Sequence, residues 1–414
     1  MKKTKIIATI GPSSEKSTNL KKMILSGMNI ARINMSHQYD LNDLKKLIIK
    51  IRKQAEKLDR SVAILFDLCG PKIRVSFDNK HQNIKVKKNQ AFTLGNGKVD
   101  IPINLPLKFK NIKPGALVKI DDGYLSFKVE GTKDNILKIK SQNDGEIING
   151  KGINLPGIDL DVDTVTKKDI DDVKLALELK IDWLAMSFVR SEEDILKLKK
   201  IFQKHNHQIP VIAKIEKPEA IQNLKKIAMA FDGILVARGD LGVEMPINQL
   251  PLLQKEIVNK CLQNKKPVII ATQMLESMIN NVNPTRAEVN DIANAIYDGV
   301  DAVMLSAETA VGKYPIESLE MMSSIANTVE ADLDPLNFSR YIPDKVRKSD
   351  RRSSICHAAM NMSNDLHIKA IIVMTESGST AIKMAQYRPN SNIYALCPYP
   401  DTCRMLSLIW GVTS

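Results

Sequence analysis

Eight short apolar segments alternate with longer segments of helical period along this chain of 414 residues, and this alternation limits the possible folds most. Buried strands followed by amphipathic helices, repeated in order, are typical of parallel strands joined by crossover helices. Eight such units predict a closed (β/α)8 barrel, the TIM barrel of the α/β class. The predicted strands are residues 5–11, 29–36, 62–68, 183–188, 211–216, 233–239, 267–274 and 302–309.

One region interrupts the alternation. Residues 70–152 are rich in Gly, Asn and Lys and contain short alternating apolar runs, which predicts a small β-barrel domain inserted after the third strand. The catalytic barrel would then comprise residues 1–69 and 153–334. Residues 335–414 begin with a polar link that contains prolines, and they predict a short, incomplete α/β domain with a helix at 355–363 and a strand at 370–374. The prolines of the link are Pro335 and Pro343.

The charge balance is basic, with 60 Lys and Arg against 47 Asp and Glu, a net +13. The lysines are spread along the chain and no basic patch is interleaved with aromatic residues, so we expect no nucleic-acid partner. No apolar run approaches the roughly 18 residues that a membrane span needs, and no signal segment is evident, so we expect a cytoplasmic protein without a membrane partner. Five cysteines without a C-x-x-C pair argue against a disulfide framework or a zinc site.

Polar residues gather where the predicted strands end, which is the end of a TIM barrel where active sites form. Any one of them could be an ordinary strand-end residue, but their joint placement is harder to explain without a function. These residues are Arg32, Asn34, Ser36, Asp67, Lys214, Glu216, Gly239, Asp240, Thr272 and Glu308.

Glu216 and Asp240 leave neighbouring strands at the same rim, so their carboxylates can converge on one hard divalent cation, Mg²⁺ or Mn²⁺. Lys214 lies on the same strand face as Glu216, two residues earlier. It could form a buried ion pair there, or it could stabilise charge on a transferring phosphoryl group. A phosphate could accept further hydrogen bonds from Arg32, Arg74, Lys151 and His37. A P-loop and a G-x-G-x-x-G motif are both absent.

Seven longer motifs give the chain a family resemblance: it resembles pyruvate kinase from Thr4 to about Val412. The motifs are TKIIATIGP (4–12), ARINMSH (31–37), GINLPG (152–157), AKIE (213–216), ARGDLGVE (237–244), ATQMLESM (271–278) and MLSAETA (304–310). The resemblance implies Mg²⁺-dependent phosphoryl transfer from phosphoenolpyruvate to ADP, which gives pyruvate and ATP in the last step of glycolysis.

Roles follow from the resemblance by motif position. Glu216 and Asp240 would hold Mg²⁺, and Lys214 would stabilise the phosphoryl group in transfer. The backbone of Ala237, Gly239 and Asp240, together with Thr272, would hold the carboxylate and enolate oxygens, and Thr272 is the position associated with proton delivery. Arg32 would hold the transferring phosphate, and the inserted domain would close as a lid. The residues that would face the nucleotide are Asn34, His37, Arg74 and Lys151.

Three departures from the family pattern are visible. The third-strand motif, often D-T-K-G-P-E-I-R, reads DLCGPKIR over 67–74. Members with Glu at the position of Lys72 generally use K⁺, so Lys72 predicts independence of K⁺, although Asn34, Ser36 and Asp67 of the monovalent-cation position are retained. Val311 stands where a Lys is common.

The third departure is the short C-terminal region. The resemblance implies a homo-oligomer, usually a tetramer, and part of its contacts would come from this region. The loop 375–380 resembles one that binds an effector phosphate, but the segments that complete such a site are not in this chain, so we expect weak or absent activation by sugar phosphates.

Two other functions stay open on the sequence alone. The lysine and carboxylates could serve a divalent-metal aldolase or lyase that acts on pyruvate enolates, although the lid and Arg32 argue against it. The chain could also be an inactive phosphate-binding or regulatory protein. An assay for pyruvate formation from phosphoenolpyruvate and ADP, coupled to lactate dehydrogenase, separates these possibilities.

Overall fold

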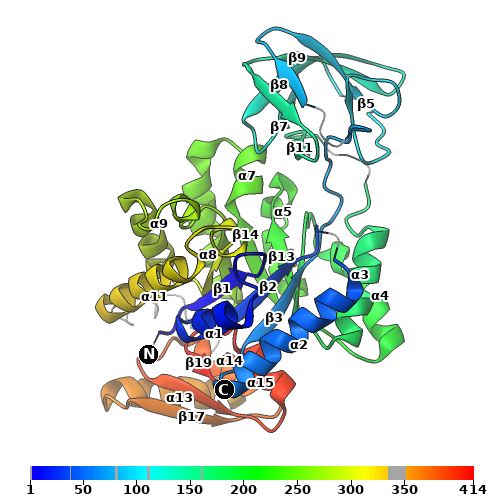
Figure 1. The fold of residues 1–414 in the computed structure, drawn as a ribbon. Coiled ribbons are helices and arrows are strands. Elements are labelled where there is room, and N and C mark those ends of the chain that lie inside the picture. Colours follow the sequence, from blue (N-terminus) through cyan, green and yellow to red (C-terminus); the bar gives the residue numbers. More distant parts are fainter. Residues whose placement is uncertain are drawn as a thin grey trace.

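The computed structural model describes residues 2–37, 39–79, 83–109, 112–158, 160, 162–333 and 351–414. A central barrel carries a β-rich domain at one end and a small α/β domain at the opposite end (Figure 1). The predicted fold class is confirmed in all three parts. The proposed domain boundaries stay predictions, and the link with Pro335 and Pro343 lies outside the described residues.

Eight parallel strands close the barrel in the order β1-β16-β15-β14-β13-β12-β3-β2. Each of them lies within a segment predicted as a strand, and most of their side chains are buried because helices cover the outside while side chains fill the inside. The strands are β1 Lys5–Thr9, β2 Ile30–Asn34, β3 Ala63–Asp67, β12 Trp183–Met186, β13 Val211–Ile215, β14 Gly233–Ala237, β15 Val268–Ala271 and β16 Ala302–Leu305.

The helices surround this barrel with amphipathic faces. Helix α2 is representative: Leu44, Leu47, Ile48 and Ile51 form its buried stripe, and the Asp40 side chain accepts backbone hydrogen bonds at its N-terminus. The barrel helices are α1 Ser17–Leu25, α2 Leu41–Lys57, α3 Lys167–Glu178, α4 Leu196–His205, α5 Pro218–Gln222, α6 Leu224–Ala230, α7 Arg238–Glu244, α8 Leu250–Asn264, α9 Arg286–Tyr297, α10 Ala307–Ala310 and α11 Pro315–Asp332. Short 3₁₀ turns are η1 Glu192–Ile195, η2 Ile247–Gln249 and η3 Glu276–Ile279.

The inserted domain is a curled sheet of order β11-β7-β8-β9-β5-β6 with a separate two-stranded ribbon of β10 and β4. Its own apolar core includes Phe92 and Phe127, whose rings meet edge to face at 6.0 Å. It stands above the carboxyl ends of the barrel strands (Figure 1). Its strands are β4 Asn83–Val86, β5 Ala91–Gly95, β6 Ile101–Pro102, β7 Leu117–Ile120, β8 Leu125–Lys133, β9 Ile136–Ser141, β10 Gly145–Ile148 and β11 Ile153–Asn154.

The C-terminal domain packs against the opposite, N-terminal end of the barrel. Trp183 Nε1 of β12 donates to the carbonyl of Met405 at 3.0 Å, and Arg404 pairs with Asp182 at 2.8 Å. The domain has a parallel sheet of order β17-β18-β19, and the predicted helix and strand are both present. Its elements are α13 Arg351–Asp365, β17 Ala370–Met374, α14 Ser379–Ala385, β18 Asn392–Leu396, α15 Pro400–Leu406 and β19 Val412–Thr413.

All five cysteines carry free thiols. Within the described ranges, no helix is both long and apolar enough to cross a membrane.

Candidate active site

The centre of the site is the Lys214 ammonium group, which lies inside the lid end of the barrel. Its Nζ donates to Ser187 Oγ at 2.8 Å and pairs with Glu216 Oε1 at 2.8 Å and Asp67 Oδ1 at 3.1 Å. Burial alone would lower the pKa of Lys214, but Asp67, Glu216 and Asp240 outweigh it and raise the pKa. Lys214 is therefore a fixed, fully charged cation that three strand ends hold in place.

A second cation, Arg32, lies on the other side of Asp67. Its Nε and Nη2 both contact Asp67 Oδ2, at 2.7 and 2.6 Å, and its Nη1 donates to Thr9 Oγ1 at 2.8 Å. Burial would raise the pKa of Asp67, but Lys214 and Arg32 together hold it below the usual value. Asp67 therefore stays ionised and keeps the two cations close together at the rim.

The two candidate metal ligands lie near one another, Glu216 buried and Asp240 half-buried. Glu216 Oε2 accepts the backbone N–H of Phe188 at 2.8 Å, which orients this carboxylate. Burial raises the pKa of Glu216, and the charge of Asp240 adds to that rise although Lys214 opposes it. Two carboxylates that repel each other suit a shared divalent cation, so the donor set fits Mg²⁺ or Mn²⁺.

The remaining ligands of such a cation would have to come from elsewhere. Within the described ranges no three His, Cys, Asp or Glu side chains gather into a metal centre. Mg²⁺ commonly binds through one or two carboxylates and completes its shell with water and substrate phosphates. This arrangement fits a cation that enters together with a phosphorylated substrate.

Lys72, from the connection between barrel and lid, contacts the second of these carboxylates. Its Nζ lies 3.0 Å from Asp240 Oδ1. Burial would lower the pKa of Lys72, but Asp240 and the more distant Glu216 outweigh it and raise the pKa. Lys72 and Lys214 together also overcome the effect of burial on Asp240 and lower the pKa of that carboxyl.

Thr272 follows β15 in a backbone conformation that is rare for a β-branched residue, with φ of 70°. Its Oγ1 accepts the backbone N–H of Gly239 at 2.8 Å and donates to the carbonyl of Ala271 at 2.6 Å. Arg238 stabilises this turn, because its Nη2 donates to the Thr272 carbonyl at 2.7 Å. The turn therefore places Thr272 beside the start of α7, the helix that directly follows Ala237 of β14.

Of the candidate nucleotide residues, Asn34 adjoins this cluster through the backbone, because it is paired in register with Asp67. Asn34 Oδ1 accepts the backbone N–H of Ser36 at 3.2 Å, and the His37 side chain is exposed. Arg74 Nη1 donates to the Gly150 carbonyl at 2.9 Å, and Lys151 pairs with Asp121 at 2.8 Å. The structure thus places the last two at the base of the lid.

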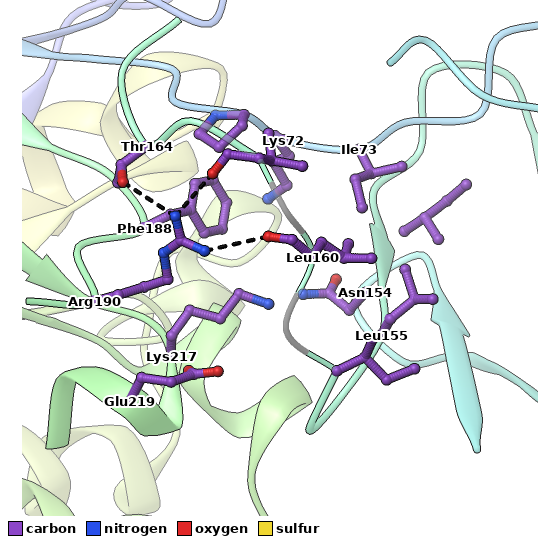
Figure 2. Close-up of a pocket in the computed structure, with 14 residues that line it drawn as sticks. Lys72, Ile73, Asn154, Leu155, Leu160, Thr164, Phe188, Arg190, Lys217 and Glu219 are labelled. Atoms are coloured by element: carbon purple, nitrogen blue, oxygen red, sulfur yellow. Dashed lines mark hydrogen bonds between the residues drawn. The ribbon is translucent and has the colours of Figure 1, made fainter. Parts of the chain in front are cut away.

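Sequence reasoning missed Ser187 and Phe188, which supply a hydroxyl to Lys214 and an N–H to Glu216. Both follow β12, so the strand-end rule that identified the other residues applies to them as well. A small cavity of about 70 Å³ adjoins the site between the barrel and the lid connection. Figure 2 shows its lining, in which Arg190 donates to the Leu160 carbonyl and to Thr164 Oγ1.

Fold and site together are typical of a (β/α)8-barrel enzyme in which an inserted β domain stands over a cluster of charged side chains at the carboxyl ends of the strands. Comparison with known proteins specifies the family. The family model "Pyruvate kinase, barrel domain" matches residues 1–319, and "Pyruvate kinase, alpha/beta domain" matches residues 353–414.

Individual relatives agree with the family models. A pyruvate kinase of Thermotoga maritima is 43% identical over 415 residues, which cover 99% of this chain and 87% of that protein. One of Staphylococcus aureus is 40% identical over 425 residues, or 100% and 71% of the two chains. The crystal structure of a pyruvate kinase from Cryptosporidium parvum superposes with a TM-score of 0.92 at 35% identity, covering 100% of this chain and 86% of that one. The chain belongs to the pyruvate kinase family and is a phosphotransferase of glycolysis.

Proposed function

We propose that Lys214 is the catalytic cation of this phosphotransferase. The observation that carries this proposal is its fixed position among Ser187, Glu216 and Asp67, beside the two candidate metal ligands. A phosphoryl group in transfer spreads negative charge over its oxygens, and a cation already held in place stabilises that charge without reorganisation. Arg32 acts with Lys214 from the other side of Asp67 and holds the transferring phosphate.

Glu216 and Asp240 are the proposed ligands of Mg²⁺ or Mn²⁺. When bound, the cation would supply charge neutralisation for the phosphoryl oxygens and for the enolate of pyruvate. The backbone of Ala237, Gly239 and Asp240, together with Thr272, is proposed to hold the carboxylate and enolate oxygens of the substrate. Thr272 lies beside Gly239 and is placed to pass a proton toward the enolate.

The nucleotide is proposed to bind between the barrel rim and the lid, in contact with Asn34, His37, Arg74 and Lys151. Arg74 and Lys151 lie at the base of the lid, so ADP held there would be enclosed when the lid closes. Closure excludes water from an intermediate that hydrolysis would destroy. A cytoplasmic location also belongs to this proposal.

A more specific part of the proposal is that the activity does not depend on K⁺. Lys72 places a unit positive charge 3.0 Å from Asp240, and a second monovalent cation beside it would be repelled. The retained ligands are also engaged: Asp67 contacts Arg32 and Lys214, and Asn34 Oδ1 accepts the Ser36 N–H. Protein cations therefore supply the charge that K⁺ would bring.

Pyruvate formation from phosphoenolpyruvate and ADP in Mg²⁺ buffer, with a bulky organic cation as the only monovalent cation, tests this proposal. We expect full activity there, and we expect Lys72→Glu to depend on K⁺ because the substitution removes the built-in charge. A wild-type rate that rises tenfold or more on adding KCl at matched ionic strength would show that Lys72 does not replace the ion.

A further inference from the structure

A buried carboxylate outside the catalytic centre, Glu244, joins three parts of the molecule. It is the last residue of α7, and its Oε1 accepts hydrogen bonds from Lys217 Nζ at 2.7 Å and from Asn154 Nδ2 at 2.8 Å. The Glu244 side chain is 1% exposed, so water cannot readily replace either partner. We call these three residues the Glu244 clamp.

Local structure does not account for a charged group at this place. A carboxylate near the C-terminus of a helix lies close to unpaired carbonyl groups, which disfavours negative charge. Burial adds a further cost that only a paired and hydrogen-bonded charge can offset. Lys217 and Asn154 provide that compensation, and both come from other elements of the fold.

The first partner connects the two candidate metal ligands. Lys217 follows Glu216 directly, at the end of β13, while Glu244 lies one helical turn after Asp240 in α7. The ion pair between Lys217 and Glu244 therefore ties together the two segments that carry the carboxylates. It can hold their spacing before any cation arrives.

The second partner brings the lid to the same point. Asn154 of β11 is paired in register with Lys119 of β7. Asn154 contacts the Glu244 side chain, and Lys119 Nζ donates to the Val243 carbonyl at 2.6 Å. Two neighbouring residues of the lid sheet thus contact two consecutive residues at the end of α7.

The cavity beside the lid connection shows this arrangement directly. In Figure 2 the Lys217 ammonium group and the Asn154 amide point toward one another from the barrel and from the lid. Both side chains line the cavity, and Glu244 bonds to both of them. A change in the position of the lid would therefore change what surrounds the carboxylate.

We propose that Glu244 is a positioning residue: through Lys217 it sets the spacing of Glu216 and Asp240, and through Asn154 it makes that spacing respond to the lid. This inference rests on the proposed metal site. It assigns to Glu244 no contact with substrate or metal.

Titration of the substrate-free protein with Mn²⁺, followed through the EPR signal of unbound Mn²⁺, tests the proposal without measuring activity. We expect Lys217→Met and Glu244→Gln to weaken Mn²⁺ binding about tenfold, because residues that orient metal ligands typically change metal affinity by about this factor. Lys217→Arg keeps the positive charge and should retain most of the Mn²⁺ affinity. Asn154→Leu should leave Mn²⁺ affinity within twofold but raise KM for ADP severalfold, because only the contact with the lid is lost.

Arg404→Met is the matched control, because it breaks an equally buried pair with Asp182 at the opposite end of the barrel. It should leave Mn²⁺ affinity unchanged.

Glu216→Ala distinguishes failure of the clamp from failure of the proposed metal site. If it weakens Mn²⁺ binding while Lys217→Met does not, the clamp is overturned and the metal site stands. If neither variant weakens binding, the metal site fails and the clamp fails with it.

Discussion

The two ends of the barrel contain the same kinds of charged side chain but fix them differently. At the end that faces the C-terminal domain, an aspartate immediately before a strand accepts a backbone N–H from the neighbouring strand. Asp182 accepts from Ile64, Asp232 from Val211 and Asp301 from Val268, at 2.8 to 2.9 Å. A backbone donor therefore fixes each of these anions at the start of a strand, and an arginine also pairs with two of them, Arg404 with Asp182 and Arg388 with Asp301.

At the lid end the anions are held mainly by side-chain cations. Asp67 is shared by Arg32 and Lys214, and Asp240 contacts Lys72. Cations on long side chains can exchange one anion for another, whereas a strand N–H cannot move to a new partner. This difference suits the proposed site at the lid end, where an anionic ligand would compete for the cations, and a structural role for the charges at the opposite end.

Removal of the central cation at the lid end should have the largest effect on activity. We expect Lys214→Met to lower kcat at least a hundredfold, because loss of one preorganised electrostatic contact raises the barrier by about 3 kcal/mol or more. Steady-state rates of pyruvate formation, with circular dichroism to verify folding, measure this. A folded variant with near-normal turnover would contradict the catalytic role of Lys214.

Removal of a cation at the opposite end should do the reverse. Arg404 pairs with the buried Asp182, and loss of one partner of a buried pair leaves an uncompensated charge. Arg404→Met is therefore expected to lower the free energy of unfolding by about 3 kcal/mol while kcat stays within twofold. Chemical denaturation and the same rate assay measure both quantities. A large loss of kcat in the folded variant would abolish the distinction between the two ends.

Metal binding sharpens the comparison further. Glu216→Ala and Asp240→Ala should each weaken binding of Mn²⁺ about tenfold or more, since each removes one of two carboxylate ligands. The matched change Asp232→Ala, at the other end of the barrel, should not alter Mn²⁺ affinity. Calorimetric titration in the absence of substrate measures all three. Unchanged affinity in both lid-end variants would place the metal elsewhere.

Much of the fold could be predicted because it depends on local pattern. Strands buried on both faces form continuous apolar runs, and helices such as α2 carry a regular apolar stripe. The polar rim could be predicted for a similar reason, because the carboxyl end of a parallel strand marks its place. Asp67, Lys214 and Glu216 were identified in this way, and their contacts agree with a shared centre.

Other residues could not be predicted because their partners lie far away in the sequence. Glu244 contacts Asn154, which is 90 positions earlier, and no local pattern distinguishes it from an ordinary charged residue at a helix end. Asp182 and Asp301 are different, since each directly precedes a strand and so had a local signal. That signal indicates a structural role, because it lies at the end of the barrel opposite the candidate site.

The smallest expected effect is on the pH dependence of stability, and it has opposite sign at the two ends. Burial raises the pKa of Asp182 despite Arg404, whereas Lys214 and Arg32 lower the pKa of Asp67 despite burial. An unfolded Asp ionises near pH 4. As the pH rises above about 4, the unfolded chain loses its proton at Asp182 first, so this residue lowers the stability until the raised folded pKa is passed. As the pH falls below about 4, the unfolded chain gains a proton at Asp67 before the folded protein does. Stability is therefore lost until the pH has fallen past the lowered pKa of the folded protein.

The free energy of unfolding, measured against pH, should therefore show that Asp182→Asn removes a decline above about pH 4. Asp67→Asn should remove a decline below about pH 4. If the difference in unfolding free energy between variant and wild type changed with pH in the same direction for both variants, the two ends of the barrel would not hold their carboxylates differently.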